Sequence, residues 1–217
     1  MSPAFSQLNL SNASLVRRRL LATAFALPLF CAFRPVRAAG PRRTLVVCHS
    51  RTGTTEALAR AAAEALGADF RTIEPLEPYA AEYADMTALA REEKRTGARR
   101  ELKGPLPDAS GYDLVVVASP VWWGGLSTPV STYLADEARA GHLKGKLVAT
   151  LHTSGSSGPD AARAEAERLV PDARFVGEPF IASGSRARTR TDEAQAASGC
   201  QCWIGLQRSS GLCRCCL

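Results

Sequence analysis

Cysteine is scarce in most of this chain, which limits how its fold can be held together. Five of the seven cysteines lie at or after Cys200, and Cys48 is the only one within residues 39–185. A single cysteine cannot form an internal disulfide, so this part of the chain must rely on a hydrophobic core. A chain of 217 residues is long enough for one domain with such a core.

The sequence also lacks an apolar run long enough for an ordinary transmembrane helix. The apolar run at residues 20–33 follows three arginines at 17–19. It is shorter than the roughly 20 residues that span a bilayer, but its length is typical of a signal peptide. Val36 and Ala38 provide the small residues of a cleavage site. We predict that residues 1–38 are a twin-arginine-like signal peptide for export to the periplasm, which leaves no stable membrane anchor after cleavage. An uncleaved anchor is the alternative.

A basic surface is missing from the central part of the chain, despite a formal net charge of +6. Residues 44–185 contain 15 Lys/Arg and 19 Asp/Glu, a charge of −4. The positive excess comes from arginines before and after this segment. Nucleic-acid-binding domains carry a basic patch, so we expect no nucleic-acid partner.

Apolar runs alternate with amphipathic segments between residues 44 and 185. We expect strands at 45–48, 68–73, 114–118, 147–151 and 174–181, and helices at 54–66, 82–95, 128–140 and 159–169. The second helix is expected to bury Met86, Leu89 and Ala90. The alternation predicts an α/β fold with a doubly wound, five-stranded parallel sheet.

The segment between the first strand and the first helix is rich in hydroxyl groups. Residues 50–55 read Ser-Arg-Thr-Gly-Thr-Thr. A helix N-terminus offers backbone N–H groups and a partial positive charge to a phosphate, and Gly53 permits close approach of the backbone. The segment therefore predicts a phosphate site, with a capped turn that binds nothing as the alternative.

Other phosphate-binding loops fit this segment poorly. A Walker loop requires a lysine, and none lies between Arg43 and Lys94. A dinucleotide-binding loop requires three spaced glycines, and only Gly53 is present. A tyrosine-phosphatase-like loop would have an arginine six residues after Cys48, where this chain has Thr54.

Two further segments follow predicted strands, at the edge of the sheet where α/β proteins bind ligands. Residues 119–125 read Ser-Pro-Val-Trp-Trp-Gly-Gly, and residues 153–158 read Thr-Ser-Gly-Ser-Ser-Gly. Adjacent exposed tryptophans are costly unless they cover a flat apolar group, although one could belong to the core. The glycine-rich segment allows backbone N–H groups to reach the carbonyl oxygens of a ring. Together the three segments predict a flavin mononucleotide (FMN) site.

These motifs resemble those of the flavodoxin family. Residues 50–55 are similar to its Ser-x-Thr-Gly-Asn-Thr phosphate motif, with Thr54 in place of asparagine. The sequence from Leu106-Pro107-Asp108 through the double tryptophan is similar to a bacterial flavodoxin-like subgroup. The resemblance covers about residues 44–185 and implies a sheet order of 2-1-3-4-5, an FMN-binding domain over 39–185 and non-covalent FMN. The FMN-binding residues that it implies are Ser50, Arg51, Thr52, Gly53, Thr54, Thr55, Pro120, Val121, Trp122, Trp123, Gly124, Thr153, Ser154, Gly155, Ser156 and Gly158.

Two functional classes are compatible with this site. The first is an exported electron-transfer protein that exchanges electrons with redox partner proteins. The second is an NAD(P)H-dependent quinone or flavin reductase that uses FMN on the same scaffold. The sequence has no second nucleotide-binding motif, which favours the electron carrier, and a binding module without redox activity is a third possibility. We predict no catalytic residue and no metal ligand, because His49, His142 and His152 are scattered along the sequence.

The pattern fails after residue 185. A flavodoxin-like domain is expected to end with a helix that covers the sheet, but residues 198–217 are rich in cysteine, arginine, glycine and serine. We interpret 186–217 as an atypical Cys-rich tail, and the closing helix is in doubt. The tail is either an out-of-frame terminus, which we favour, or a metal- or disulfide-bonded knot. Its Cys-x-Cys spacing is not the usual Cys-x-x-Cys of zinc sites.

Overall fold

The structure is a computed structural model that describes residues 42–183, so the predicted signal peptide and tail lie outside the described residues. Its centre is a parallel sheet with the strand order β2-β1-β3-β5-β6. The strands are β1 (Thr44–Cys48), β2 (Asp69–Thr72), β3 (Leu114–Trp122), β5 (Leu147–Ser154) and β6 (Arg174–Phe175). This order confirms the predicted doubly wound α/β fold, in which the fifth strand lies next to the fourth.

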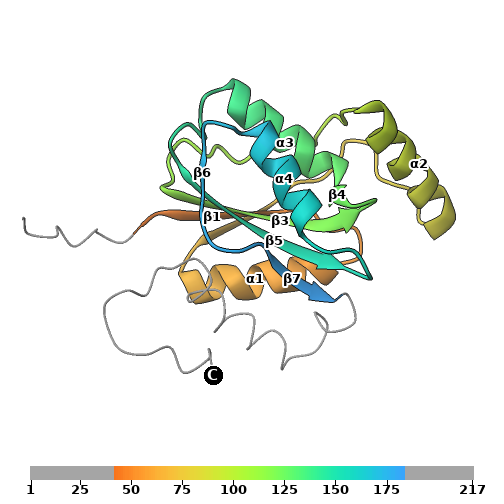
Figure 1. Cartoon of the computed structure of the whole chain (residues 1–217), viewed down its shortest axis with the longest axis horizontal. Helices are drawn as coiled ribbons and strands as arrows, with labels where there is room; N and C mark the ends of the chain where they lie inside the picture. The colour runs from red at the N-terminus through yellow and green to blue at the C-terminus, as the bar shows by residue number, and fades with distance from the viewer. Residues whose placement is uncertain (1–41, 184–217) are drawn as a thin grey trace, which may run out of the picture. The chain divides into compact units, whose positions relative to one another are not determined.

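Helices cover both faces of the sheet (Figure 1). Helix α1 (Thr54–Leu66) packs on one face, and α3 (Thr128–Arg139) and α4 (Asp160–Leu169) pack on the other. Successive side chains of a strand point to opposite faces, so Val116 lies in the core under α1 and Val115 and Val117 lie in the core under α3. All three valines are fully buried, and each such side chain stabilises the fold by about 1.5–3 kcal/mol.

Helix α2 (Tyr83–Thr96) differs from the other three helices, because it lies beyond the carboxyl ends of the strands (Figure 1). Its Met86 and Ala90 are buried against Tyr79 and Trp122. Leu89 is 41% exposed, so the prediction that it faces the core was wrong. No helix within residues 42–183 has both the length and the apolar character needed to cross a membrane.

The predicted fifth strand at 174–181 forms two separate pieces. β6 pairs with the beginning of β5, and β7 (Phe180–Ser183) pairs with its end. Gly177, with φ of 67°, lies between them, and Pro179 cannot donate a backbone hydrogen bond to a neighbouring strand. The chain therefore leaves the sheet between the two pieces and returns to it.

The segment at 119–125, which was expected to follow the strand at 114–118, is largely a strand and a hairpin. β3 continues to Trp122 and then reverses into the short strand β4 (Gly125–Leu126). Val121 pairs with Leu126, and Trp122 pairs with Gly125. The predicted end of the strand at residue 118 was wrong, because this antiparallel pairing extends β3 beyond the part of the strand that helices cover.

Candidate functional site

A cavity of about 320 Å³ lies at the carboxyl ends of β1, β3 and β5. Parallel strands end at one edge of the sheet, so the segments that follow them meet there. The cavity joins residues from all three predicted segments and from α2. It is lined by Ser50, Arg51, Thr52, Thr54, Thr55, Tyr83, Met86, Pro120, Val121, Trp122, Thr153, Ser154 and Gly155.

The first turn of α1 forms one wall of this cavity. Gly53 is the N-cap residue, and its φ of 82° is accessible to glycine at little cost. No side chain of the described residues caps the helix. The backbone N–H groups of the first turn have no partners within the helix and stay open to an anion, with the positive end of the helix dipole behind them. The hydroxyl groups of Thr52 and Thr54, which are 3.4 Å apart, line the cavity beside this turn.

A buried hydrogen bond connects the first and third segments. The hydroxyl groups of Thr55 and Thr153 are 2.7 Å apart. Further along, the backbone N–H of Ser157 donates to Ser154 Oγ at 2.8 Å, which shapes the turn that follows β5. Ser156 and Gly158 are exposed parts of that turn and do not line the cavity.

Trp122 lines the cavity and is braced from behind by other aromatic side chains. Its ring makes edge-on contacts with Tyr79 at 4.9 Å and with His49 at 5.4 Å between ring centroids. Tyr79 donates a 2.6 Å hydrogen bond to Glu93, which pairs with Arg100 at 3.1 Å. The contacts with Tyr79 and His49, and the hydrogen bonds that hold Tyr79, therefore fix the position of the Trp122 ring at the edge of the cavity.

Trp123 is not part of the same wall. It occupies the turn between β3 and β4 with φ of 49°, and Gly124 follows with φ of 78°. Positive φ at both turn residues is typical of a tight hairpin, but a bulky residue is uncommon in this conformation. Trp123 is 56% exposed, and its Nε1 donates to the Thr87 carbonyl at 3.0 Å while Arg91 lies over its ring. Trp123 and Gly124 line a separate pocket of about 590 Å³.

A partly buried ion pair between Lys94 and Glu165 lies against the β3–β4 hairpin. Glu165 accepts hydrogen bonds from Lys94 at 2.7 Å, from Ser131 at 2.7 Å and from the backbone N–H of Leu126 at 2.9 Å. These contacts join α2, α3, α4 and β4 at one carboxylate. A Cβ atom on Gly125 would overlap Glu165 Oε2, so a larger residue at this position would require the carboxylate to move.

Nothing in the sequence indicated that α2 contributes to the cavity. Tyr83 is 67% exposed at the start of the helix, and Met86 is buried one turn later. The amphipathic pattern of α2 indicated only that one face is buried. The position of the helix depends on the long segment after β2, for which the sequence has no periodic signal.

The two histidines near the cavity are buried and not exposed to it. Burial lowers the pKa of His49 to about 4, and its Nδ1 lies 2.9 Å from Ser127 Oγ. Burial likewise lowers the pKa of His152 to about 4, and Arg163 lowers it further, while the Ser119 backbone opposes the shift. Within residues 42–183, no hydrogen bond of good geometry reaches either ring nitrogen of His152. Cys48 is also buried, which raises the pKa of its thiol and makes it a poor nucleophile.

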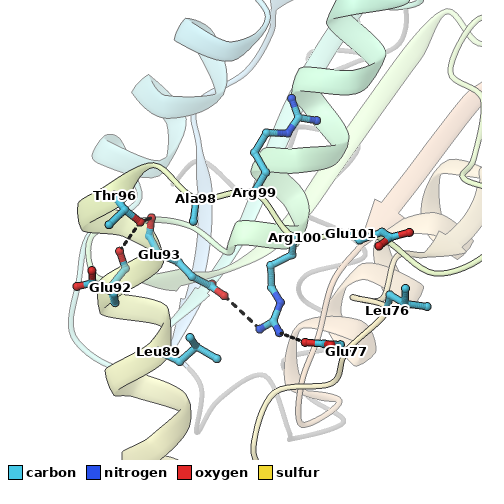
Figure 2. A pocket seen from close by; sticks show the side chains of 10 residues that line it. All are labelled: Leu76, Glu77, Leu89, Glu92, Glu93, Thr96, Ala98, Arg99, Arg100 and Glu101. Atoms are coloured by element: carbon cyan, nitrogen blue, oxygen red, sulfur yellow. Dashed lines mark hydrogen bonds and ion pairs between the residues drawn. The ribbon is translucent and has the colours of Figure 1, made fainter.

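A larger pocket of about 490 Å³ lies between α2 and the segment that follows it (Figure 2). Its charged side chains largely neutralise one another. Arg100 pairs with Glu93 and lies 3.9 Å from Glu77, and Arg99 pairs with Asp136. The pocket lacks the open helix N-terminus and the flat aromatic wall of the cavity at the strand ends, which is the better candidate for a ligand site.

The cavity at the strand ends combines an anion site with a flat apolar wall. The open N-terminus of α1 and four hydroxyl groups, from Ser50, Thr52, Thr54 and Thr55, suit a phosphate. Trp122 suits an aromatic ring system. The residues present thus fit a phosphate-bearing aromatic cofactor.

The comparisons with known proteins agree with this geometry. The family model described as Flavodoxin matches residues 43–195, so the chain belongs to the flavodoxin family. No curated protein sequence matches the chain.

Three solved structures share the fold of this chain. A candidate flavoprotein of Bacteroides eggerthii DSM 20697 is 27% identical, with a TM-score of 0.62, over 76% of this chain and 98% of its own. A candidate flavoprotein of Bacteroides uniformis ATCC 8492 is 26% identical, with a TM-score of 0.58, over 71% of this chain and 96% of its own. A flavoprotein of Lactobacillus acidophilus NCFM, crystallised with FMN, shares the fold at 20% identity and a TM-score of 0.56, over 66% of this chain and 94% of its own.

Proposed function

We propose that this protein binds FMN in the cavity at the strand ends and acts as an electron-transfer flavoprotein. The observation that carries the proposal is the meeting of three segments in one cavity, with the open N-terminus of α1 and Trp122 among its walls. The Lactobacillus flavoprotein crystallised with FMN supports it by its fold. FMN supplies the redox chemistry when bound, and the protein contributes binding, orientation and electrostatics.

Each segment has its own part in holding the cofactor. Residues 50–55 bind the phosphate, through hydroxyl groups and the N–H groups of the first turn of α1. Trp122 covers one face of the ring. Thr153, Ser154 and Gly155 line the cavity from β5 and offer polar groups to the ring edge. Trp123 lies at the outer end of the hairpin, where it is available to a partner.

A quinone or flavin reductase is the second candidate. The pocket of about 590 Å³ beside the hairpin turn favours it, because a reductase must admit a second substrate close to the cofactor. Its Lys94 already pairs with Glu165, which leaves Arg168 as its exposed cation among the described residues. The reductase would therefore have little charge with which to hold NAD(P)H phosphates.

One pair of assays tests both proposals. The purified protein is titrated with FMN while tryptophan fluorescence is followed, and the loaded protein is then mixed with NAD(P)H and a quinone. An electron carrier binds one FMN per chain and consumes NAD(P)H only when a partner reductase is added. Steady NAD(P)H oxidation without a partner would support the reductase, and a protein that ignores FMN would contradict both.

We also propose that the protein is exported by the twin-arginine route, on the strength of residues 1–38. Replacing the arginines at 17–19 with lysine should retain the protein in the cytoplasm. The measurement is cell fractionation with the unmodified sequence in parallel. Equal distribution of both proteins would contradict the proposal.

A further inference from the structure

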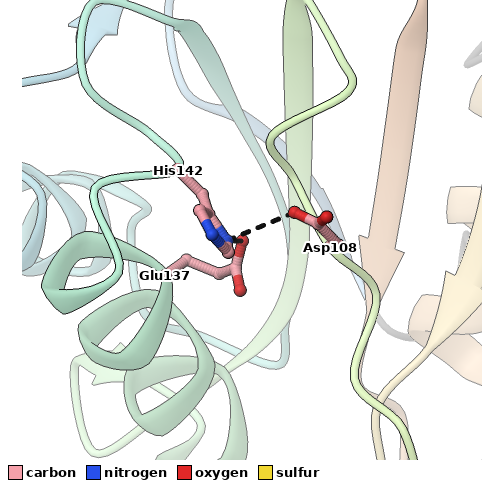
Figure 3. A group of neighbouring side chains, drawn as sticks. All are labelled: Asp108, Glu137 and His142. Carbon is pink, nitrogen blue, oxygen red and sulfur yellow. Dashed lines mark hydrogen bonds and ion pairs between the residues drawn. The ribbon is translucent and has the colours of Figure 1, made fainter.

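We propose that Asp108, Glu137 and His142 form a binding site for a divalent transition metal of the zinc class. Glu137 lies near the end of α3, His142 follows that helix, and Asp108 lies on the segment before β3 (Figure 3). Nδ1 of His142 is 3.1 Å from Glu137 Oε2 and 3.2 Å from Asp108 Oδ1. All three potential ligand atoms lie within 4.8 Å of one another.

The cluster contains two carboxylates and a single imidazole. Within residues 42–183, the one ion-pair contact of each carboxylate is to His142. An imidazole carries at most one positive charge, which cannot neutralise two carboxylates. The Glu137 side chain is 9% exposed, and buried carboxylates are rare unless they are paired. Lys146 acts on Asp108 at a distance, but its amine donates to the Ser110 carbonyl at 2.9 Å.

The distances suit a metal ion in place of the imidazole proton. Zinc binds histidine nitrogen and carboxylate oxygen at about 2.0–2.2 Å, so neighbouring ligand atoms of a tetrahedral site lie about 3.3–3.5 Å apart. The two observed distances are within a few tenths of an ångström of that separation. One nitrogen and two oxygens suit zinc better than magnesium or calcium, which prefer oxygen alone. Water would complete the coordination.

Backbone and hydroxyl groups already orient both carboxylates. The N–H of Ala109 donates to Glu137 Oε2 at 2.9 Å. The N–H and hydroxyl of Ser110 donate to the two oxygens of Asp108 at 2.7 Å and 2.8 Å. Metal sites commonly have such outer hydrogen bonds, which hold the ligands in position before the metal binds.

The site lies at the opposite end of the sheet from the cavity. Asp108 precedes β3, and His142 precedes β5, so both are near the amino ends of these strands. A bound metal would fasten the segment around Asp108 to the end of α3. We therefore expect it to stabilise the fold and to leave FMN binding unchanged.

The test must separate this site from the cysteines of residues 200–216, because thiolates bind zinc well. The full-length protein is reduced, alkylated with iodoacetamide and stripped of metal with a chelator. It is then titrated with Zn²⁺ by calorimetry and with Co²⁺ by absorption spectroscopy. We expect one saturable site per chain, a raised melting temperature with Zn²⁺, and cobalt bands without sulfur-to-metal charge transfer.

Three variants make the assignment specific. Asp108→Asn and His142→Gln change side chains that are partly exposed and should each weaken Zn²⁺ binding by at least about tenfold. The control is Asp136→Asn, which removes the carboxylate next to Glu137 in sequence. It should leave Zn²⁺ binding unchanged, and circular dichroism confirms folding of each variant. Absence of saturable binding, or equal affinity in all variants, would overturn the proposal.

Discussion

The hydroxyl groups of Thr55 and Thr153 share a buried hydrogen bond of 2.7 Å across 98 residues of sequence. Replacing either residue with valine keeps the volume but leaves the other hydroxyl without this partner, which costs about 1–3 kcal/mol. The double variant should lose less stability than the two single variants lose together, because it leaves no hydroxyl group without a partner. Urea unfolding of the two single variants and the double variant, without FMN, measures this coupling. Additive losses would show that the bond contributes nothing.

The two tryptophans should behave differently towards FMN, because only Trp122 lines the cavity. Trp122→Ala should weaken FMN binding by about 1 kcal/mol or more, the scale of an aromatic contact with its buried area. Trp123→Ala is the matched control and should change the affinity little. Fluorescence titration measures both. A larger loss from Trp123→Ala would mean that the hairpin turns towards the flavin.

Thr52 tests the phosphate site. Thr52→Val removes a hydroxyl group from the cavity, and a lost hydrogen bond to a charged group costs about 1.5–3 kcal/mol. FMN should bind roughly 10- to 150-fold more weakly, while riboflavin, which lacks the phosphate, should be little affected. Thr72→Val, at the exposed end of β2, is the control. Equal losses for the two ligands would place Thr52 away from the phosphate.

The meeting of the three segments could be predicted from the sequence because it follows from topology. Parallel strands end at one edge of a sheet, so the residues after β1, β3 and β5 had to lie near one another. The alternation of apolar and amphipathic segments was enough to establish those strands. Once those strands were predicted, the hydroxyl groups of residues 50–55 and Gly155 were expected at the carboxyl edge of the sheet.

The separation of Trp122 from Trp123 could not be predicted in the same way. It depends on a two-residue turn in which Trp123 has positive φ, a conformation for which glycine, asparagine or aspartate would be the usual sign. The hydrogen bond from Trp123 to the Thr87 carbonyl joins the turn to α2. The prediction for Leu89 failed for a related reason. Amphipathic spacing indicates which residues share one face of a helix, but not how much of that face the rest of the domain covers.

Gly125 tests the packing below the hairpin turn. Gly125→Ala would place its methyl group against a Glu165 carboxylate that Lys94, Ser131 and Leu126 already hold. We expect a loss of about 1–3 kcal/mol in the free energy of unfolding, as for other overpacked sites. Gly155→Ala is the control, because a methyl group there meets no atom within 4 Å. Equal unfolding curves for the two variants would show that the carboxylate moves aside freely.

His152 should make the stability of the fold depend on pH. Its pKa is lowered from 6.5 to about 4 by burial, so between these values the unfolded chain binds the proton more readily than the folded chain. The contribution of neutral His152 to the free energy of unfolding is therefore complete above pH 6.5. It is lost as the pH decreases towards 4, which lowers the stability by about 3 kcal/mol.

The comparison that isolates this contribution is His152→Leu against the unchanged protein. Leucine removes the titrating group and fills the space without a buried polar atom, and neither ring nitrogen of His152 has a hydrogen bond of good geometry to a described residue that the change would break. The variant should equal or exceed the original stability at pH 7.5, and its advantage should grow as the pH falls to 4.5. Carboxylates that also titrate in this range act alike in both proteins, so their effect cancels in the difference. Urea unfolding at the two pH values measures it, and a difference that does not change with pH would show that His152 keeps its ordinary pKa in the folded protein.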